Sequence, residues 1–155
     1  MSWAPALAGG PAGAVLEAGL DAGPAFHYQA SALWVRRSAE HGASRGPTST
    51  VGVGPCAAAI TAEHGGLDAT SLGIRARASS VGVDAGVSIE LSAGVATSRD
   101  DTSGVGSTGV FYSTDVFDLG YAVHFPLAPQ ERPSWMGTHH VGVRFVVPVW
   151  EAAGR

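Results

Sequence analysis

The sequence predicts an all-β protein, either an antiparallel sandwich or a closed barrel of about seven or eight strands. The main observation is that apolar side chains occupy every second position over long stretches, which is the pattern of a strand with two different faces. The clearest stretches are Val81 to Val95, Phe117 to Leu127 and Val141 to Val149. In addition, the chain is rich in glycine, with 22 residues, and only 14% of its residues are charged. Long, regular strands of low charge account for both features.

The N-terminal part carries a weaker form of the same pattern. Residues 1–13 are rich in Pro, Gly and Ala, and we expect them to be disordered, followed by a single β domain over residues 14–155. Alternation predicts a short strand from Ala14 to Leu20 and a longer one over residues 25–36. The Asp-Ala-Gly-Pro sequence between them indicates a turn.

The region that follows allows two interpretations. Residues 37–49 form a polar loop, and residues 48–54 a short strand. The segment 55–64 is either a short helix or a continuation of that strand. Pro55 suits a first helical turn and the alanines from Ala57 favour a helix, whereas the segment is also apolar enough for a strand.

The second half predicts antiparallel strands throughout. Alternation is firm from Thr70, a polar turn covers residues 98–104, and a strand covers residues 116–127. A proline-containing loop at 128–138 then leads to a last strand over residues 139–150. In these strands we assign the apolar set to the interior and the polar set to solvent. The predicted inward residues are Val87, Ile89, Leu91 and Val95, and the predicted outward residues are Ser88, Glu90 and Ser92.

Composition excludes several classes of function. The chain contains no lysine, so it forms no lysine Schiff base and has no P-loop lysine. The net charge of -4 gives no basic surface for nucleic acid. Cys56 is the single cysteine, which says nothing about the compartment, and we find neither a convincing signal peptide nor a transmembrane helix. The localisation therefore stays open.

No cofactor and no catalytic residue are predicted. Gly52-x-Gly54-x-x-Ala57 has the outline of a dinucleotide-binding turn, but the segment before it is not a buried strand and no βαβ pattern follows it. A nucleophile elbow is absent from the sequence. An enzyme with an internal pocket would have to use His124, Asp118 or Glu90 as acid or base, and we expect these residues to face solvent. The chain is thus more consistent with a non-enzymatic function.

No metal site is predicted either. The six histidines include no His-x-His pair, and there is no Cys-x-x-Cys pair. His139 and His140 are adjacent in a predicted strand, so they point to opposite faces. If a metal were nevertheless bound, His27, His64, His124 and His139 would be the ligands to test.

Trp135 and Met136 are the predicted partner-binding residues. They lie in the loop Pro133-Ser-Trp-Met-Gly137 between two strands, where a large amphipathic side chain suits an exposed anchor. The alternative is that this loop folds over one end of the core.

Residues 99–145 carry one family resemblance. The segment RDDTSGVGSTGVFYSTDVFDLGYAVHFP, the PSW loop and HHVGVRF are similar to the middle of actinoporin-type pore-forming proteins. The resemblance covers under a third of the chain. It implies a β-sandwich that binds membranes through aromatic loops, with Trp135 in the aromatic position.

Three function hypotheses follow. The first is a non-catalytic β-domain that binds a protein partner or self-assembles, because long strands with free edges pair readily with other chains. The second is a membrane-active β-protein, either an outer-membrane-type barrel or an actinoporin-like pore former, since alternating strands of about ten residues fit such a barrel. The third is a small barrel enzyme with an internal pocket.

Overall fold

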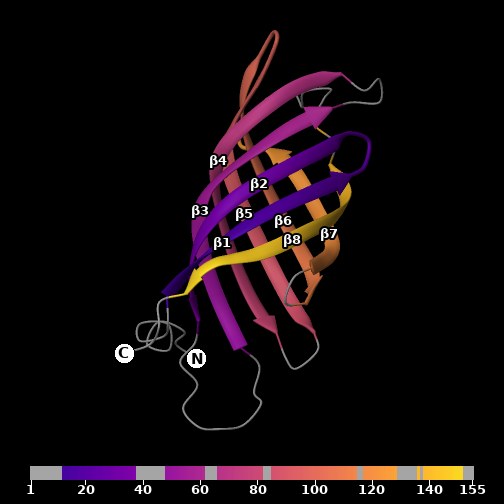
Figure 1. Cartoon of the computed structure of the whole chain (residues 1–155). Coiled ribbons are helices and arrows are strands. Elements are labelled where there is room, and N and C mark those ends of the chain that lie inside the picture. Colours follow the sequence, from indigo (N-terminus) through magenta and orange to yellow (C-terminus); the bar gives the residue numbers. More distant parts are fainter. Residues whose placement is uncertain are drawn as a thin grey trace, which may run out of the picture.

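The chain forms one closed barrel of eight antiparallel strands (Figure 1). The computed structural model describes residues 12–37, 48–61, 66–81, 85–114, 117–128, 136 and 138–151. The strands are β1 (Ala12–Ala22), β2 (Phe26–Arg37), β3 (Thr48–Thr61), β4 (Leu67–Val81), β5 (Gly86–Ser98), β6 (Thr102–Ser113), β7 (Phe117–Pro126) and β8 (His139–Glu151). The described part is all-β, as the sequence predicts, and contains no helix.

Each strand pairs with the next one along the chain, and β8 pairs with β1 to close the barrel. The ladder partners fix how far the strands are staggered. Starting from Ala12 and passing from partner to partner through all eight strands, the path returns to β1 at Ala22. A displacement of this size over eight strands corresponds to a strand tilt of about 40° from the barrel axis.

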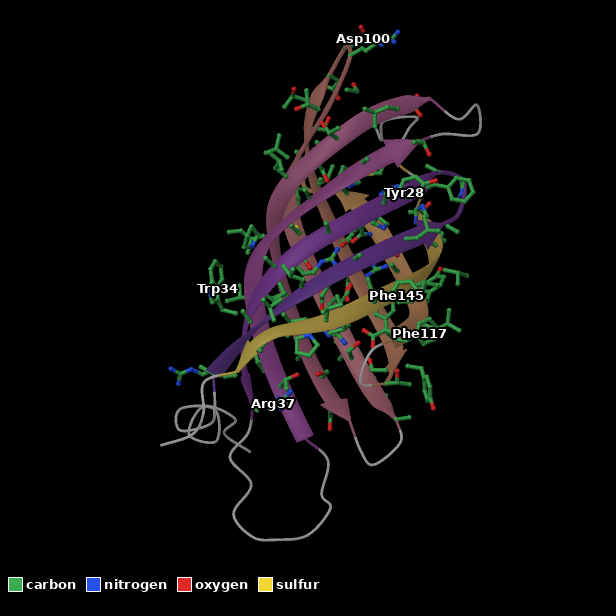
Figure 2. The ribbon with its side chains drawn as sticks, in the orientation of Figure 1. Tyr28, Trp34, Arg37, Asp100, Phe117 and Phe145 are labelled. Atoms are coloured by element: carbon green, nitrogen blue, oxygen red, sulfur yellow. The ribbon has the colours of Figure 1, made fainter. Side chains whose placement is uncertain are left out.

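The barrel has two ends. We call the end where β1 begins and β8 finishes the terminal end, and the opposite end, with the β1–β2 and β5–β6 turns, the distal end. β5 and β6 extend beyond the other strands at the distal end, up to the turn at Asp100 (Figure 2).

The segment 55–64 continues as a strand. β3 runs unbroken to Thr61 and pairs with β2 on one side and β4 on the other. The helix alternative is therefore wrong for residues 55–61, because pairing on both sides outweighs the helix propensity of the alanines. Residues 62–64 lie outside the described residues. So do residues 1–11 of the N-terminal segment, whereas Ala12 and Gly13 already belong to β1.

The prediction of which face is buried is wrong. In β5 the apolar side chains Val87, Ile89 and Leu91 are about half exposed, whereas Ser88 and Glu90 are buried. The other strands follow the same rule, so the polar set points into the lumen and the apolar set points out. The alternation itself is confirmed, but its two faces are exchanged.

One group of apolar side chains lies at the distal end of the lumen. There Ala25, Ile60, Ala69, Ala96 and Met136 pack together. In the rest of the described lumen, polar and charged side chains predominate beside the buried Leu33 and Phe111, and they form the candidate site.

Candidate functional site: the charged lumen

The terminal half of the lumen is crossed by a buried ion-pair triad. Arg77 on β4 extends between two carboxylates, with its Nη1 at 2.6 Å from Glu17 Oε1 and its Nη2 at 2.5 Å from Asp118 Oδ2. Glu17 belongs to β1 and Asp118 to β7, so the triad spans the width of the barrel. Ser31 on β2 also donates a hydrogen bond to Glu17 at 2.8 Å.

The middle of the lumen continues the same alternation of charges. Arg75 lies 3.6 Å from Glu17 and 3.8 Å from Glu90. Arg144 on β8 then bridges Glu90, at 3.2 Å, and Asp21, at 2.5 Å. Its guanidinium also lies over the Phe111 ring, 4.7 Å from the centroid, which adds a cation–π contact. The result is one continuous network of charged side chains from five strands, β1, β4, β5, β7 and β8.

The charged side chains of this network depend on one another for their counter-charges. Three guanidinium groups meet four carboxylates, and each of these side chains is at most about one-tenth exposed. Because an unpaired buried charge costs several kcal/mol, removing one partner is expected to destabilise the fold far more than the net contribution of an ion pair suggests.

Glycines on the barrel wall leave room for the large side chains. A Cβ added at Gly142 would lie 2.6 Å from Asp21 Oδ1 and 2.7 Å from the Phe111 ring, and one at Gly19 would lie 2.6 Å from the Arg144 side chain. Gly19 lies between Glu17 and Asp21 on the inner face of β1, and Gly142 precedes Arg144 on the inner face of β8, so the missing side chains leave space for Arg144.

Towards the distal end the network leads into a group of histidines. The Asp21 carboxylate accepts hydrogen bonds from Arg144, from Gln29 and from His124 Nε2, the last at 3.0 Å. The His124 ring packs against His27 and His140, and all three rings are buried. We refer to His27, His124 and His140 as the histidine cluster.

The lumen retains two cavities on either side of the network. The larger one, about 220 Å³, opens at the terminal end and ends at Glu17 and Arg77. Its wall is mixed: Val15, Leu33 and Val146 are apolar, whereas Thr50 and Ser79 are polar. The smaller one, about 40 Å³, lies between Arg75 and the histidine cluster. The network lies between these two cavities.

The candidate residues named from the sequence fall into different places. Trp135 lies outside the described residues, as does His64. Met136 is buried, with 4% of its surface exposed, in the apolar distal group. Residues 129–135 and 137 of this loop lie outside the described residues, and the partner-binding role of the pair stays a prediction.

The histidine predictions can be compared with the structure directly. His139 and His140 point to opposite faces, as predicted: His139 is exposed and hydrogen-bonds Tyr121 on the outer surface, whereas His140 is buried in the lumen. Of the three suggested metal ligands that the structure describes, His27 and His124 come together beside His140, whereas His139 lies on the outer face. Within the described ranges, no three His, Cys, Asp or Glu side chains are arranged to hold a metal ion.

The acid and base candidates do not face solvent. His124, Asp118 and Glu90 are all buried in the lumen, and His124 and Glu90 are held by Asp21 and Arg144 respectively. The expectation that they are exposed is wrong, for the same reason as in β5. Sequence reasoning also missed Glu17, Asp21, Arg75, Arg77 and Arg144. The available signal was their position, because each lies on the polar phase of an alternating strand.

Comparisons with protein-family models, with curated protein sequences and with solved structures give no match for this chain. The resemblance of residues 99–145 to actinoporin-type proteins therefore stays a prediction. A search of the described residues for helices finds none with the length and apolar character needed to cross a membrane.

Proposed function

We propose that this protein is a transmembrane β-barrel of the outer-membrane type, whose lumen is closed by the ion-pair network. The observation that carries the proposal is the outer surface. Among the described residues, 23 large hydrophobic side chains are more than one-third exposed, and they occur on all eight strands. Tyr28, Trp34, Phe117 and Phe145 project outward in Figure 2.

The distribution of charge supports the same function. Every described Asp, Glu or Arg in the middle of a strand is in the lumen. The remaining ones lie at strand ends or in turns: Arg36, Arg37, Asp68, Arg99, Asp100, Asp101 and Glu151. Water-exposed proteins rarely show continuous apolar patches above a few hundred Å², whereas a lipid-facing surface requires one.

The dimensions also fit a bilayer. At a tilt of about 40°, the outward residues of β2 from Phe26 to Trp34 span about 20 Å along the barrel axis, close to the apolar band of about 25 Å typical of such barrels. Trp34, Tyr112, Phe117 and Phe145 lie towards the terminal end, and Phe26, Tyr28 and Phe125 lie towards the distal end. Aromatic side chains near both borders are typical of membrane barrels.

Closure of the sheet bears on the hypothesis that the protein self-assembles through free strand edges. Because β1 pairs with β8, no described strand of the barrel has a free edge for self-assembly, and all ladders are internal, as a bilayer requires. Binding of a protein partner through another surface stays a prediction.

The test compares two arginines on the outer face of β5. Leu91 is midway along the strand and outward, whereas Thr97 is outward near its distal end. We expect Leu91→Arg to destabilise the barrel in phospholipid vesicles by about 2–4 kcal/mol and Thr97→Arg by about 1 kcal/mol or less, since the cost of a lipid-facing charge depends on depth. Urea unfolding of vesicle-inserted protein measures both values.

Insertion itself provides the second measurement. The refolded wild-type chain should co-float with vesicles, resist added protease over its strands and leave an entrapped dye inside, because the lumen is closed. A chain that folds to β-structure without vesicles or detergent and does not co-float would contradict the proposal. Equal costs at Leu91 and Thr97 would contradict it as well.

A further inference from the structure

The larger lumen cavity, which opens at the terminal end, has a polar side and an apolar side. We call it the terminal cavity, and its volume is about 220 Å³. Two neighbouring strands, β3 and β4, build its polar side. Thr50 and Ser79 are ladder partners on these strands, and Arg77 lies at the next inward position of β4, deeper in the barrel. Two hydroxyls and a guanidinium therefore border the same space.

The polar side offers hydrogen-bond donors to the cavity. Arg77 contacts Glu17 at 2.6 Å and Asp118 at 2.5 Å, and these contacts use two of the five N–H groups of a guanidinium. The hydroxyls of Thr50 and Ser79 hydrogen-bond to each other, which uses one of their two protons. The second hydroxyl proton and further N–H groups of Arg77 are thus available to an acceptor.

The carboxylate at the inner end of the cavity is less accessible than the guanidinium. Glu17 accepts hydrogen bonds from Arg77 at Oε1 and from Ser31 at Oε2. Its side chain is 1% exposed, whereas that of Arg77 is 10% exposed. A ligand in the cavity therefore has better access to the donor than to the acceptor. Because a guanidinium forms strong, charge-assisted hydrogen bonds with carboxylates, the cavity favours an anionic carboxylate over a cation.

The other side of the cavity is apolar. Val15 on β1 pairs with Leu33 on β2 and with Pro148 on β8, and Val35 and Val146 extend the same surface. For comparison, an apolar cavity of about 150 Å³ holds one benzene molecule. The terminal cavity is thus large enough for an alkyl chain of about six to eight carbons beside the polar group.

We propose that the terminal cavity binds a medium-chain monocarboxylate. The carboxylate accepts hydrogen bonds from Arg77 and from the Thr50–Ser79 hydroxyl pair, and the alkyl chain packs against the apolar side formed by Val15 and its neighbours. This assignment uses both halves of the cavity wall. It concerns the lumen and does not depend on what surrounds the outer face of the barrel.

Calorimetric titration with hexanoate tests the proposal. The full chain is kept folded in dodecyl maltoside micelles near neutral pH. Hexanoate should bind with a Kd of about 1 mM or lower, as expected for a ligand of this size. Two soluble compounds each lack one half of the pattern, since acetate has no long chain and hexylammonium has the opposite charge. Both should bind about tenfold more weakly or worse.

A cavity-filling variant locates the binding. Val15→Phe places a larger side chain in the terminal cavity and should abolish saturable binding of hexanoate. Val87→Phe makes the same change on the outer face of β5, where Val87 is 51% exposed, and should leave the Kd unchanged. Circular dichroism records whether each variant retains its β-structure.

A second variant tests the hydroxyl pair and leaves the charged network intact. The double substitution Thr50→Val with Ser79→Ala removes both hydroxyls and should weaken hexanoate binding by about threefold to tenfold. Its control is Thr97→Val with Ser80→Ala, because these two residues lie on the outer face of β5 and β4. The control should bind hexanoate like the wild type.

Three outcomes would overturn the proposal. One is the lack of saturable hexanoate binding up to about 10 mM, and another is equal affinity for hexylammonium and hexanoate. The third is an unchanged affinity for hexanoate in folded Val15→Phe and in the folded double variant. Because the titration is made in micelles, it does not require vesicle insertion. A chain that binds hexanoate in this way but does not insert into vesicles would contradict the membrane proposal alone.

Discussion

The two faces of the same strands differ in almost every physical respect. In β5, Ile89 and Leu91 are about half exposed on the outer surface, whereas Glu90 between them is 4% exposed and paired with Arg75 and Arg144. The outer face depends on its surroundings for stability, since its apolar side chains have few protein neighbours. The stability of the lumen depends on the pairing of each buried carboxylate with a guanidinium group. The comparison teaches that alternation defines two faces but does not say which of them is the interior.

The largest expected loss of stability comes from comparing Glu90, which faces the lumen, with its neighbour Ile89, which faces outward. Glu90→Ala leaves Arg144 and Arg75 with one carboxylate fewer, and we expect it to lower the free energy of unfolding by about 3–5 kcal/mol. Ile89→Ala should cost about 1–2 kcal/mol, because lipid or detergent closes around the smaller side chain and no cavity remains. Urea unfolding in micelles measures both. A larger cost at Ile89 than at Glu90 would mean that the faces are assigned the wrong way round.

The sequence analysis suggests the opposite ranking of these two costs, because it assigns Ile89 to the interior and Glu90 to solvent. The period of two was sufficient to predict strands over most of the chain, and β3 alone offered a helix as an alternative. The interior was assigned by the rule for water-soluble sheets, in which the apolar face is buried. A barrel in lipid follows the opposite rule with the same alternation.

One detail of the sequence pointed to the exchange. In β2, Tyr28 and Trp34 share a phase with alanines rather than with a large apolar core. The histidine cluster was out of reach, because His27, His124 and His140 meet only through the closure of the barrel.

An intermediate loss of stability is expected where side chains pack closely against the barrel wall. Gly142→Ala places a methyl group against Asp21 and Phe111 and should cost about 1–3 kcal/mol through displaced side chains. Gly66→Ala is the control, since a Cβ there meets nothing within 4 Å, and it should cost about 0.5 kcal/mol or less. Equal and small costs at the two positions would show that Arg144 has more room than the structure gives it.

The smallest effect concerns neutral hydrogen bonds in the lumen. Ser113 donates a hydrogen bond of 2.8 Å to Ser88, and both hydroxyls are fully buried. Ser88→Ala removes the acceptor and should cost about 1–2 kcal/mol. Thr97→Ala, on the outer face of the same strand, should cost about 0.5 kcal/mol or less. If the two variants are equally stable, polar side chains in the lumen matter only through their charges.

The pairing of β1 with β8 has a consequence for how the chain folds. Asp21 and Arg144 are neighbours on the inner face of two paired strands, although most of the chain separates them in sequence. Arg144 therefore gains its second carboxylate only when the last strand meets the first. Before β1 and β8 pair, the incomplete sheet carries charged side chains on one face and apolar side chains on the other. Neither face is yet in the environment that it has in the closed barrel. Folding of this kind is slow, because the most distant contacts in the chain are also the ones that complete the charge balance.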